Sequence, residues 1–170
     1  MALEHALLVS LRERPGTGIE LTRRFDRSIG FFWRATHQQI YKVLRRMEAD
    51  GWVAASAGDS RRTERRYEVT ALGDEQLRAW IATPTPPVAL RSDLAVKMRG
   101  ASYGDRRALL AHVEELRAEH RSRLAHFEQL EREQFPDPGS LTGRGLDTWL
   151  VLRGGIIQER FWVQWLTEYV

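Results

Sequence analysis

The 170-residue sequence contains no cysteine, which excludes disulfide bonds and thiolate metal sites. It also lacks any apolar run approaching the roughly 18 residues that a membrane-spanning helix needs. The first residues carry an acid and a histidine and show no small-residue cleavage site, so they do not resemble a signal peptide. Lysine occurs only at positions 42 and 97, and arginine supplies almost all the positive charge. The expectation is a cytoplasmic protein without a membrane partner.

Positive charge is concentrated in one segment of the chain. The net charge of the whole sequence is only +3. Residues 23–66 hold 11 basic and 5 acidic residues, whereas residues 91–170 hold 12 of each. A local excess of this kind is expected for a polyanionic partner such as double-stranded DNA. A solvated face of an arginine-rich protein would have the same composition, so the elements that carry the charge must decide between the two.

Within this basic segment, residues 36–51 are predicted to form one amphipathic helix. Apolar residues recur on one face at the spacing i, i+3, i+4, i+7. Thr36 and Gln39 fit a capping box at the start, and Asp50-Gly51 is typical of a helix end. The opposite face and its flanks offer donors suited to phosphates and base edges. The residues predicted to contact DNA on this helix are Thr36, Gln38, Gln39, Tyr41, Lys42, Arg45 and Arg46.

The elements around this helix are predicted to complete a helix-turn-helix with a wing. Helical spacing predicts a helix at residues 3–14 and a short one at about 18–27, with Thr17 as its N-cap. Residues 52–56 and 65–70 are predicted strands around a polar turn that should project into solvent. Arginines on such a hairpin can reach the phosphate backbone and the adjacent minor groove. The arginines predicted to contact DNA there are Arg61, Arg62, Arg65 and Arg66.

A proline-rich stretch marks the expected domain boundary. It follows a predicted helix at residues 74–82, whose Leu77, Trp80 and Ile81 are expected to face inward. Three prolines in four residues cannot continue a helix, so the segment is a linker. We therefore predict three regions in the chain. They are a DNA-binding domain at residues 1–83, a linker at 84–90 and a helical domain at 91–170, with helices at 91–99, 105–134 and 146–169.

The two long helices of the second domain carry more apolar surface than one small domain obviously covers. The first has a nearly heptad stripe, and the second is apolar on more than one side. Gly154-Gly155 permits a close helix crossing, at some cost in helix propensity. We therefore predict an antiparallel pair that forms a homodimer. The residues predicted for dimerisation are Leu109, Val113, Leu116, Leu124, Phe127, Leu150, Ile157 and Phe161.

Several of these segments resemble the winged-helix domain of PadR-type transcriptional regulators. The resemblance rests on QIYKVLRRMEADGWV at residues 39–53 and RRTERRYEVTALG at residues 61–73, and it covers about residues 2–82. The linker and the helices after it look like the C-terminal domain of the larger PadR type. The resemblance implies homodimeric repressors that bind DNA through the basic helix and wing, with a small molecule relieving repression in many members. It also implies that Tyr41 touches a phosphate.

Taken together, these patterns predict a mainly α protein. An N-terminal winged helix-turn-helix, with three helices and a two-stranded wing, precedes an antiparallel helical dimerisation domain. The predicted function is a sequence-specific DNA-binding transcriptional repressor that binds an inverted repeat as a homodimer and is released by a small-molecule effector. The alternative is a winged-helix module for protein–protein interaction, without an effector. A gel shift with the promoter DNA beside its own gene would separate the two.

No catalytic site, metal site or cofactor is predicted. The histidines lack metal-ligand spacing with carboxylates, and the serines lack the neighbours of a nucleophile, so an enzyme is not expected. Six tryptophans are many for this length. One interpretation is an aromatic-lined cavity for a small aromatic effector, and the other is ordinary core and dimer packing. For the first interpretation, Trp149 and Trp162 are the candidate contacts.

Overall fold

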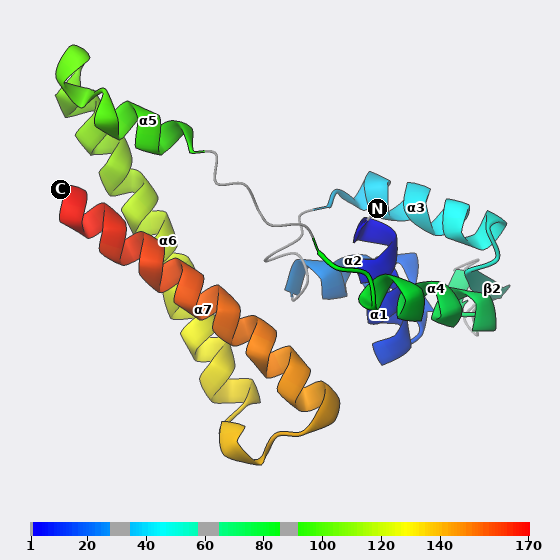
Figure 1. Cartoon of the computed structure of the whole chain (residues 1–170). Helices are drawn as coiled ribbons and strands as arrows, with labels where there is room; N and C mark the ends of the chain where they lie inside the picture. The colour runs from blue at the N-terminus through cyan, green and yellow to red at the C-terminus, as the bar shows by residue number, and fades with distance from the viewer. Residues whose placement is uncertain (1, 28–34, 58–64, 86–91) are drawn as a thin grey trace. The chain divides into compact units, whose positions relative to one another are not determined.

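The computed structural model describes residues 2–27, 35–57, 65–85 and 92–170 (Figure 1). The chain divides into two compact units, residues 1–87 and residues 88–170. The predicted linker at 84–90 lies largely outside the described residues, and the division between the units falls within it. As expected for the fold class, the described residues are mainly helical.

In the residues that the structure describes, the first unit contains four α-helices and a small antiparallel sheet. The helices are α1 (Ala2–Glu13), α2 (Gly18–Arg27), α3 (His37–Ala49) and α4 (Ala71–Ile81). The strands are β1 (Gly16–Thr17), β2 (Val53–Ala57) and β3 (Arg65–Val69), in the order β1-β3-β2. The predicted two-stranded wing therefore has a third strand. A strand of two residues is too short to show the alternation of apolar and polar residues that predicts a strand in a sequence. Strand β1 forms because Gly16 and Thr17 pair with the edge of β3.

One apolar core holds the first unit together. It lies between α1, α2, α3, α4 and the sheet, and its side chains come from the helical stripes and the inward face of the strands. Burial raises the pKa of Tyr67, so the phenol stays neutral within this core. The buried residues of the cluster are Leu7, Leu8, Leu11, Leu21, Phe25, Ile40, Leu44, Met47, Val53, Tyr67 and Leu77.

The ends of α3 are set by local hydrogen bonds, as the sequence predicts. Thr36 is the N-cap, and both halves of its capping box with Gln39 are formed. After Ala49 the chain turns through Gly51, whose φ is +73°, a conformation that favours glycine. The N–H of Trp52 donates to the carbonyl of Met47 and closes the helix end. This turn directs the chain immediately from α3 into β2.

Helix α4 differs from its prediction in its start and in its buried face. It begins at Ala71 rather than residue 74, because the Thr70 hydroxyl accepts from the N–H of Gly73. Helix α4 passes so close to the backbone of Trp52 at Gly73 that a β carbon there would be 2.1 Å from the Trp52 carbonyl oxygen, so this position has no space for a side chain. Trp80 and Ile81, expected inward, are 42% and 66% exposed. The Trp80 ring still stacks on the buried His5 of α1, with 4.5 Å between ring centroids. The prediction was wrong for Ile81, which lies at the end of α4 and extends beyond the core.

The second unit is built around two long antiparallel helices (Figure 1). Its α-helices are α5 (Asp93–Arg99), α6 (Arg106–Gln134) and α7 (Gly143–Tyr169), with 3₁₀ turns η2 (Ala101–Tyr103) and η3 (Pro138–Ser140). Helix α7 begins before the predicted residue 146, although glycines at 143 and 145 lower its propensity. The N–H of Leu146 donates to the carbonyl of Thr142, so the backbone ladder extends into this exposed first turn.

Few side chains of the second unit are fully buried. Met98 of α5, Val113 of α6 and Leu166 of α7 form a small cluster, and the Tyr169 hydroxyl donates to the carbonyl of Met98 at 3.1 Å. Further along the pair, a β carbon on Gly155 would lie 3.2 Å from the ring of Phe127, so a glycine lets α7 approach α6 closely. In the described part of the chain, no helix combines the length and apolar character needed to span a membrane.

Candidate nucleic-acid interface

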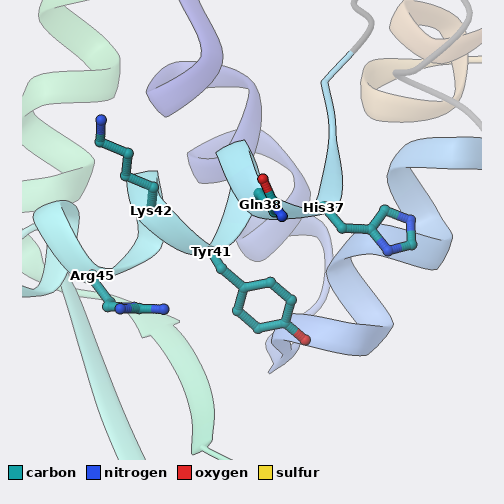
Figure 2. Close-up of a pocket in the computed structure, with 5 residues that line it drawn as sticks. All are labelled: His37, Gln38, Tyr41, Lys42 and Arg45. Carbon is teal, nitrogen blue, oxygen red and sulfur yellow. The ribbon is translucent and has the colours of Figure 1, made fainter.

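Five side chains of α3 line an open hollow on the surface of the first unit (Figure 2). They project from the side of the helix opposite its buried stripe. Sequence reasoning predicted four of them and missed His37, which was considered only as a possible metal ligand. Its position one turn before Tyr41 was the signal that could have included it. The residues that line the hollow are His37, Gln38, Tyr41, Lys42 and Arg45.

Lys42 and Arg45 supply the available positive charge of this surface. Both side chains are exposed, and neither forms an ion pair with any residue that the structure describes. Gln38 is exposed beside them, and Tyr41 is half-buried. An ammonium and a guanidinium without a carboxylate partner can bind phosphates or the acceptors of guanine, and a glutamine amide can pair with adenine.

Thr36 and Gln39, also predicted to contact DNA, use their side-chain oxygens to cap α3. The Gln39 amide oxygen accepts from the Thr36 N–H at 2.8 Å, and the Thr36 hydroxyl accepts from the Gln39 N–H at 3.2 Å. Both residues are exposed, and no described residue pairs with the Gln39 amide nitrogen, so this group can donate outward. The structure therefore gives this pair a capping role that fixes the start of the helix.

The structure places Arg46, on the flank of α3, in an ion pair with Glu4 of α1. The Glu4 side chain is only 6% exposed, and a buried carboxylate without its cation would be strongly destabilising. Arg46 therefore joins α1 to α3. The sequence could not show this, because an exposed arginine on a basic helix has the same local pattern whether it faces DNA or a distant glutamate.

The two described arginines of the wing are also held by carboxylates. Arg65 pairs with Glu48 of α3. Arg66 donates to the carbonyl of Pro15 at 3.0 Å and lies 3.8 Å from the carboxylate of Glu20 on α2. These contacts connect the base of the wing to both helices of the helix-turn-helix. The two guanidinium groups are therefore less available to bind DNA phosphates. The predicted contacts Arg61 and Arg62 lie outside the described residues.

In the second unit, the two candidate effector residues are engaged within the α6–α7 pair. Trp149 donates its indole N–H to Glu131 at 3.0 Å, and the Arg153 guanidinium lies 5.9 Å from its ring centroid. Trp162 stacks on His120, with 5.2 Å between ring centroids. An aromatic ligand at either tryptophan would therefore compete with contacts already made within the chain.

The residues predicted for dimerisation divide into three groups by their exposure. Val113 and Phe127 are buried inside the chain, so they stabilise the α6–α7 pair and present no surface to a partner. Leu109, Leu116 and Leu124 are partly covered. By contrast, Leu150, Ile157 and Phe161 of α7 are between 52% and 60% exposed. The sequence could not separate the groups, because α7 is apolar on the side facing α6 and on the side facing away.

Comparison with known proteins follows the same division of the chain. The model of the transcriptional regulator PadR-like family matches residues 7–79, and the model described as "Virulence activator alpha C-term" matches residues 90–170. A probable transcriptional regulator of Mycobacterium tuberculosis, Rv1176c, is 46% identical to the chain, with 99% of this chain and 95% of the relative covered. The chain belongs to the PadR-like family of transcriptional regulators.

Solved structures of PadR-like proteins share the whole fold. The virulence activator AphA of Vibrio cholerae superposes with a TM-score of 0.83 at 29% identity, covering 98% of this chain and 95% of its own. PadR of Bacillus subtilis, solved in complex with operator DNA, also has a TM-score of 0.83, at 22% identity, covering 99% and 97%. The same protein with p-coumaric acid gives 0.80 at 23% identity, covering 99% and 96%. This chain is therefore a transcriptional regulator with the winged-helix fold of its family.

Proposed function

We propose that this PadR-like regulator binds double-stranded DNA sequence-specifically through α3 and represses transcription. The observation that carries the proposal is the pair of exposed cations, Lys42 and Arg45, on the same face of α3 as Gln38 and Tyr41. On such a face, phosphate contacts give affinity and base-edge contacts give specificity. The B. subtilis PadR complex with operator DNA supports this role for the shared fold.

The proposal assigns residues 1–83 to DNA binding, residues 84–90 to a linker, and residues 91–170 to dimerisation. On α3, Lys42 and Arg45 are the proposed base or phosphate readers, and Gln38 is the proposed reader of adenine. Arg61 and Arg62 of the wing turn are proposed phosphate contacts. The sign of regulation is tested separately, because relatives include both a negative regulator, PadR of B. subtilis, and the virulence activator AphA.

The partner that dimerisation requires is a second copy of this chain. Leu150, Ile157 and Phe161 lie along one face of α7 and are more than half exposed, a continuous apolar stripe that water would otherwise cover. Gly154 lies within this stripe, and a β carbon there would meet nothing within 4 Å. A helix from a second copy can therefore approach closely at that point. A two-fold pair would present two α3 helices to an inverted repeat.

We also propose that a small aromatic molecule relieves repression. The support is the B. subtilis PadR structure with p-coumaric acid, a relative 23% identical to this chain. The ligand site is not assigned to Trp149 or Trp162, since both rings are already engaged. A panel of phenolic acids added to a preformed DNA complex is the direct test, with release of the DNA as the expected result.

One selection experiment tests the DNA proposal. A random duplex pool is bound to the full-length protein, and the recovered sequences are compared. The expected result is an inverted repeat with half-sites about one helical turn apart, or a multiple, whose binding weakens steeply as salt rises. A pool that stays random would contradict sequence-specific binding and favour a protein-interaction module. A reporter gene downstream of the selected site then distinguishes repression from activation.

A further inference from the structure

The ring of Tyr41 lies against the first turn of α2, not only on the surface of its own helix (Figure 2). It passes directly over Gly18. A β carbon built on Gly18 would lie 2.4 Å from Cε1 of the ring, 2.9 Å from Cζ and 3.1 Å from the hydroxyl oxygen. Carbon atoms in favourable contact are about 3.5–4.0 Å apart, so even one methyl group cannot share this space with the ring in its present position.

The backbone conformation does not explain a glycine at position 18. Among the described glycines, positive φ occurs only at Gly51 and Gly143. Gly18 is the first residue of α2, where alanine would be the better helix former. The glycine at this position therefore leaves space for the Tyr41 ring and serves no special backbone conformation.

The first turn of α2 is held firmly, so it cannot move aside for a larger residue. Thr17 and Glu20 form a reciprocal cap, with the Thr17 N–H donating to the Glu20 carboxylate at 2.9 Å and the Glu20 N–H to the Thr17 hydroxyl at 3.3 Å. The Thr22 hydroxyl donates to the Gly18 carbonyl at 2.8 Å. Arg66 of the wing lies 3.8 Å from the same Glu20 carboxylate.

The side chain of Tyr41, by contrast, is held less firmly than the start of α2. Its side chain is only half-buried, and no described residue forms a hydrogen bond with its hydroxyl. Turning such a side chain to another rotamer disturbs less than shifting a capped helix start. A β carbon at position 18 should therefore move the ring and leave the fold intact.

We infer that Gly18 is a positioning residue that sets the place of Tyr41 on the DNA-facing surface. This inference rests on the proposed DNA-binding function. With glycine at 18, the Tyr41 hydroxyl lies over α2, beside the hollow that Lys42 and Arg45 also line. A phenol there can donate one hydrogen bond to a phosphate. A side chain at position 18 moves that donor away while leaving every charge of α3 unchanged.

The test is a double-mutant cycle with Gly18→Ala, Tyr41→Ala and both together, in the full-length protein. Affinity is measured for the duplex recovered by selection. Gly18→Ala should weaken binding about tenfold for each half-site bound, the loss expected for one hydrogen bond to a charged group. In the Tyr41→Ala background the same change should have no further effect. A full additional loss in that background would overturn the inference, because Gly18 would then act independently of Tyr41.

A measurement without DNA separates this inference from the proposed function. The protein is labelled with 3-fluorotyrosine, and the Tyr41 signal in the ¹⁹F NMR spectrum is assigned by its loss in Tyr41→Phe. Gly18→Ala should shift that signal and leave the buried Tyr67 signal in place. The control is Gly104→Ala, where an added methyl group meets nothing within 4 Å. An unmoved Tyr41 signal would sink the inference whatever the protein binds.

The remaining outcomes are equally decisive. A shifted Tyr41 signal in a protein that binds no DNA would refute the proposed function and retain the positioning role. Should Gly18→Ala fail to fold, the double variant should fold, because the ring that causes the overlap is absent from it. Failure of both variants to fold would contradict the inference, since the constraint would then lie in the backbone of α2.

Discussion

The two units of this chain have similar lengths, but they cover their apolar side chains to different extents. Among the described residues, the first encloses eleven buried ones in one cluster. The second has a cluster of only three, and its last helix, α7, exposes Leu150, Ile157 and Phe161. The hydrophobic effect is roughly proportional to the apolar area removed from water. The first unit therefore has the interior of an independent domain, whereas the second leaves apolar side chains exposed on the face of α7 proposed to bind a second copy.

The largest expected effect breaks the enclosed core. Leu8→Ala removes a side chain of α1 that is 0% exposed, and it should lower the free energy of unfolding of the first unit by about 2–5 kcal/mol. Urea denaturation followed by tryptophan fluorescence measures this. Val96→Ala, at a side chain 71% exposed on α5, is the matched control and should cause almost no change. Equal losses in the two variants would contradict the contrast between the units.

The next effect concerns the open surface of α7. Ile157→Asp places a carboxylate in the middle of the exposed stripe, where its own chain does not bury it. Because the change occurs in both copies, the proposed dimer should weaken by about 3–6 kcal/mol, twice the value of one buried aliphatic side chain. Sedimentation should show a monomer. Circular dichroism should show an unchanged helical content. A variant that remains dimeric would place the interface on another face.

A smaller effect distinguishes the residues proposed to contact DNA bases from the arginines that form ion pairs within the first unit. Lys42→Ala or Arg45→Ala should change the preference between operator sequences by about 1–3 kcal/mol, the value of one bidentate base contact. Arg65→Ala should leave that preference unchanged, since its guanidinium is paired with Glu48. Competition between operator variants measures all three. A change of sequence preference in Arg65→Ala would instead indicate that Arg65 contacts DNA bases.

The smallest effect is a dependence of stability on alkaline pH. Burial raises the pKa of Tyr67 in the folded state, so the neutral phenol stabilises the fold below the ordinary tyrosine pKa of about 10. As pH rises beyond that value, the unfolded chain releases the proton more readily, and this contribution is lost. Tyr67→Phe should make the decline in stability shallower. Tyr103→Phe, at a side chain 92% exposed, should leave the decline unchanged.

Sequence alone predicted the elements whose signals are local. Helix α2 was predicted at residues 18–27 and α3 with its capping box, because caps and helical spacing are properties of neighbouring residues. The pairing of β1 with β3 was not predicted, since a strand of two residues depends on what the folded chain places beside it. The exposure of Ile81 was missed for the same reason.

The lining of the hollow on α3 was predicted in part, but the partners of the neighbouring arginines were not, for one physical reason. An arginine on a basic helix or hairpin looks the same in the sequence whether it faces solvent or a carboxylate. The structure pairs Arg46 with Glu4, and Arg65 with Glu48, so these cations connect elements within the first unit. Lys42 and Arg45 have no such partner among the described residues. Only the folded chain distinguishes the two kinds of arginine.

The adjacent glycines of α7 have a practical consequence for redesigning this protein. Gly155 faces the ring of Phe127 in its own chain, while Gly154 faces open space. A larger side chain at position 155 would therefore disturb the packing of α7 on α6 within one chain. A larger side chain at position 154 would instead project toward the proposed second copy. Substitutions of increasing size at these two positions would allow folding and assembly to be adjusted separately, within a single turn of one helix.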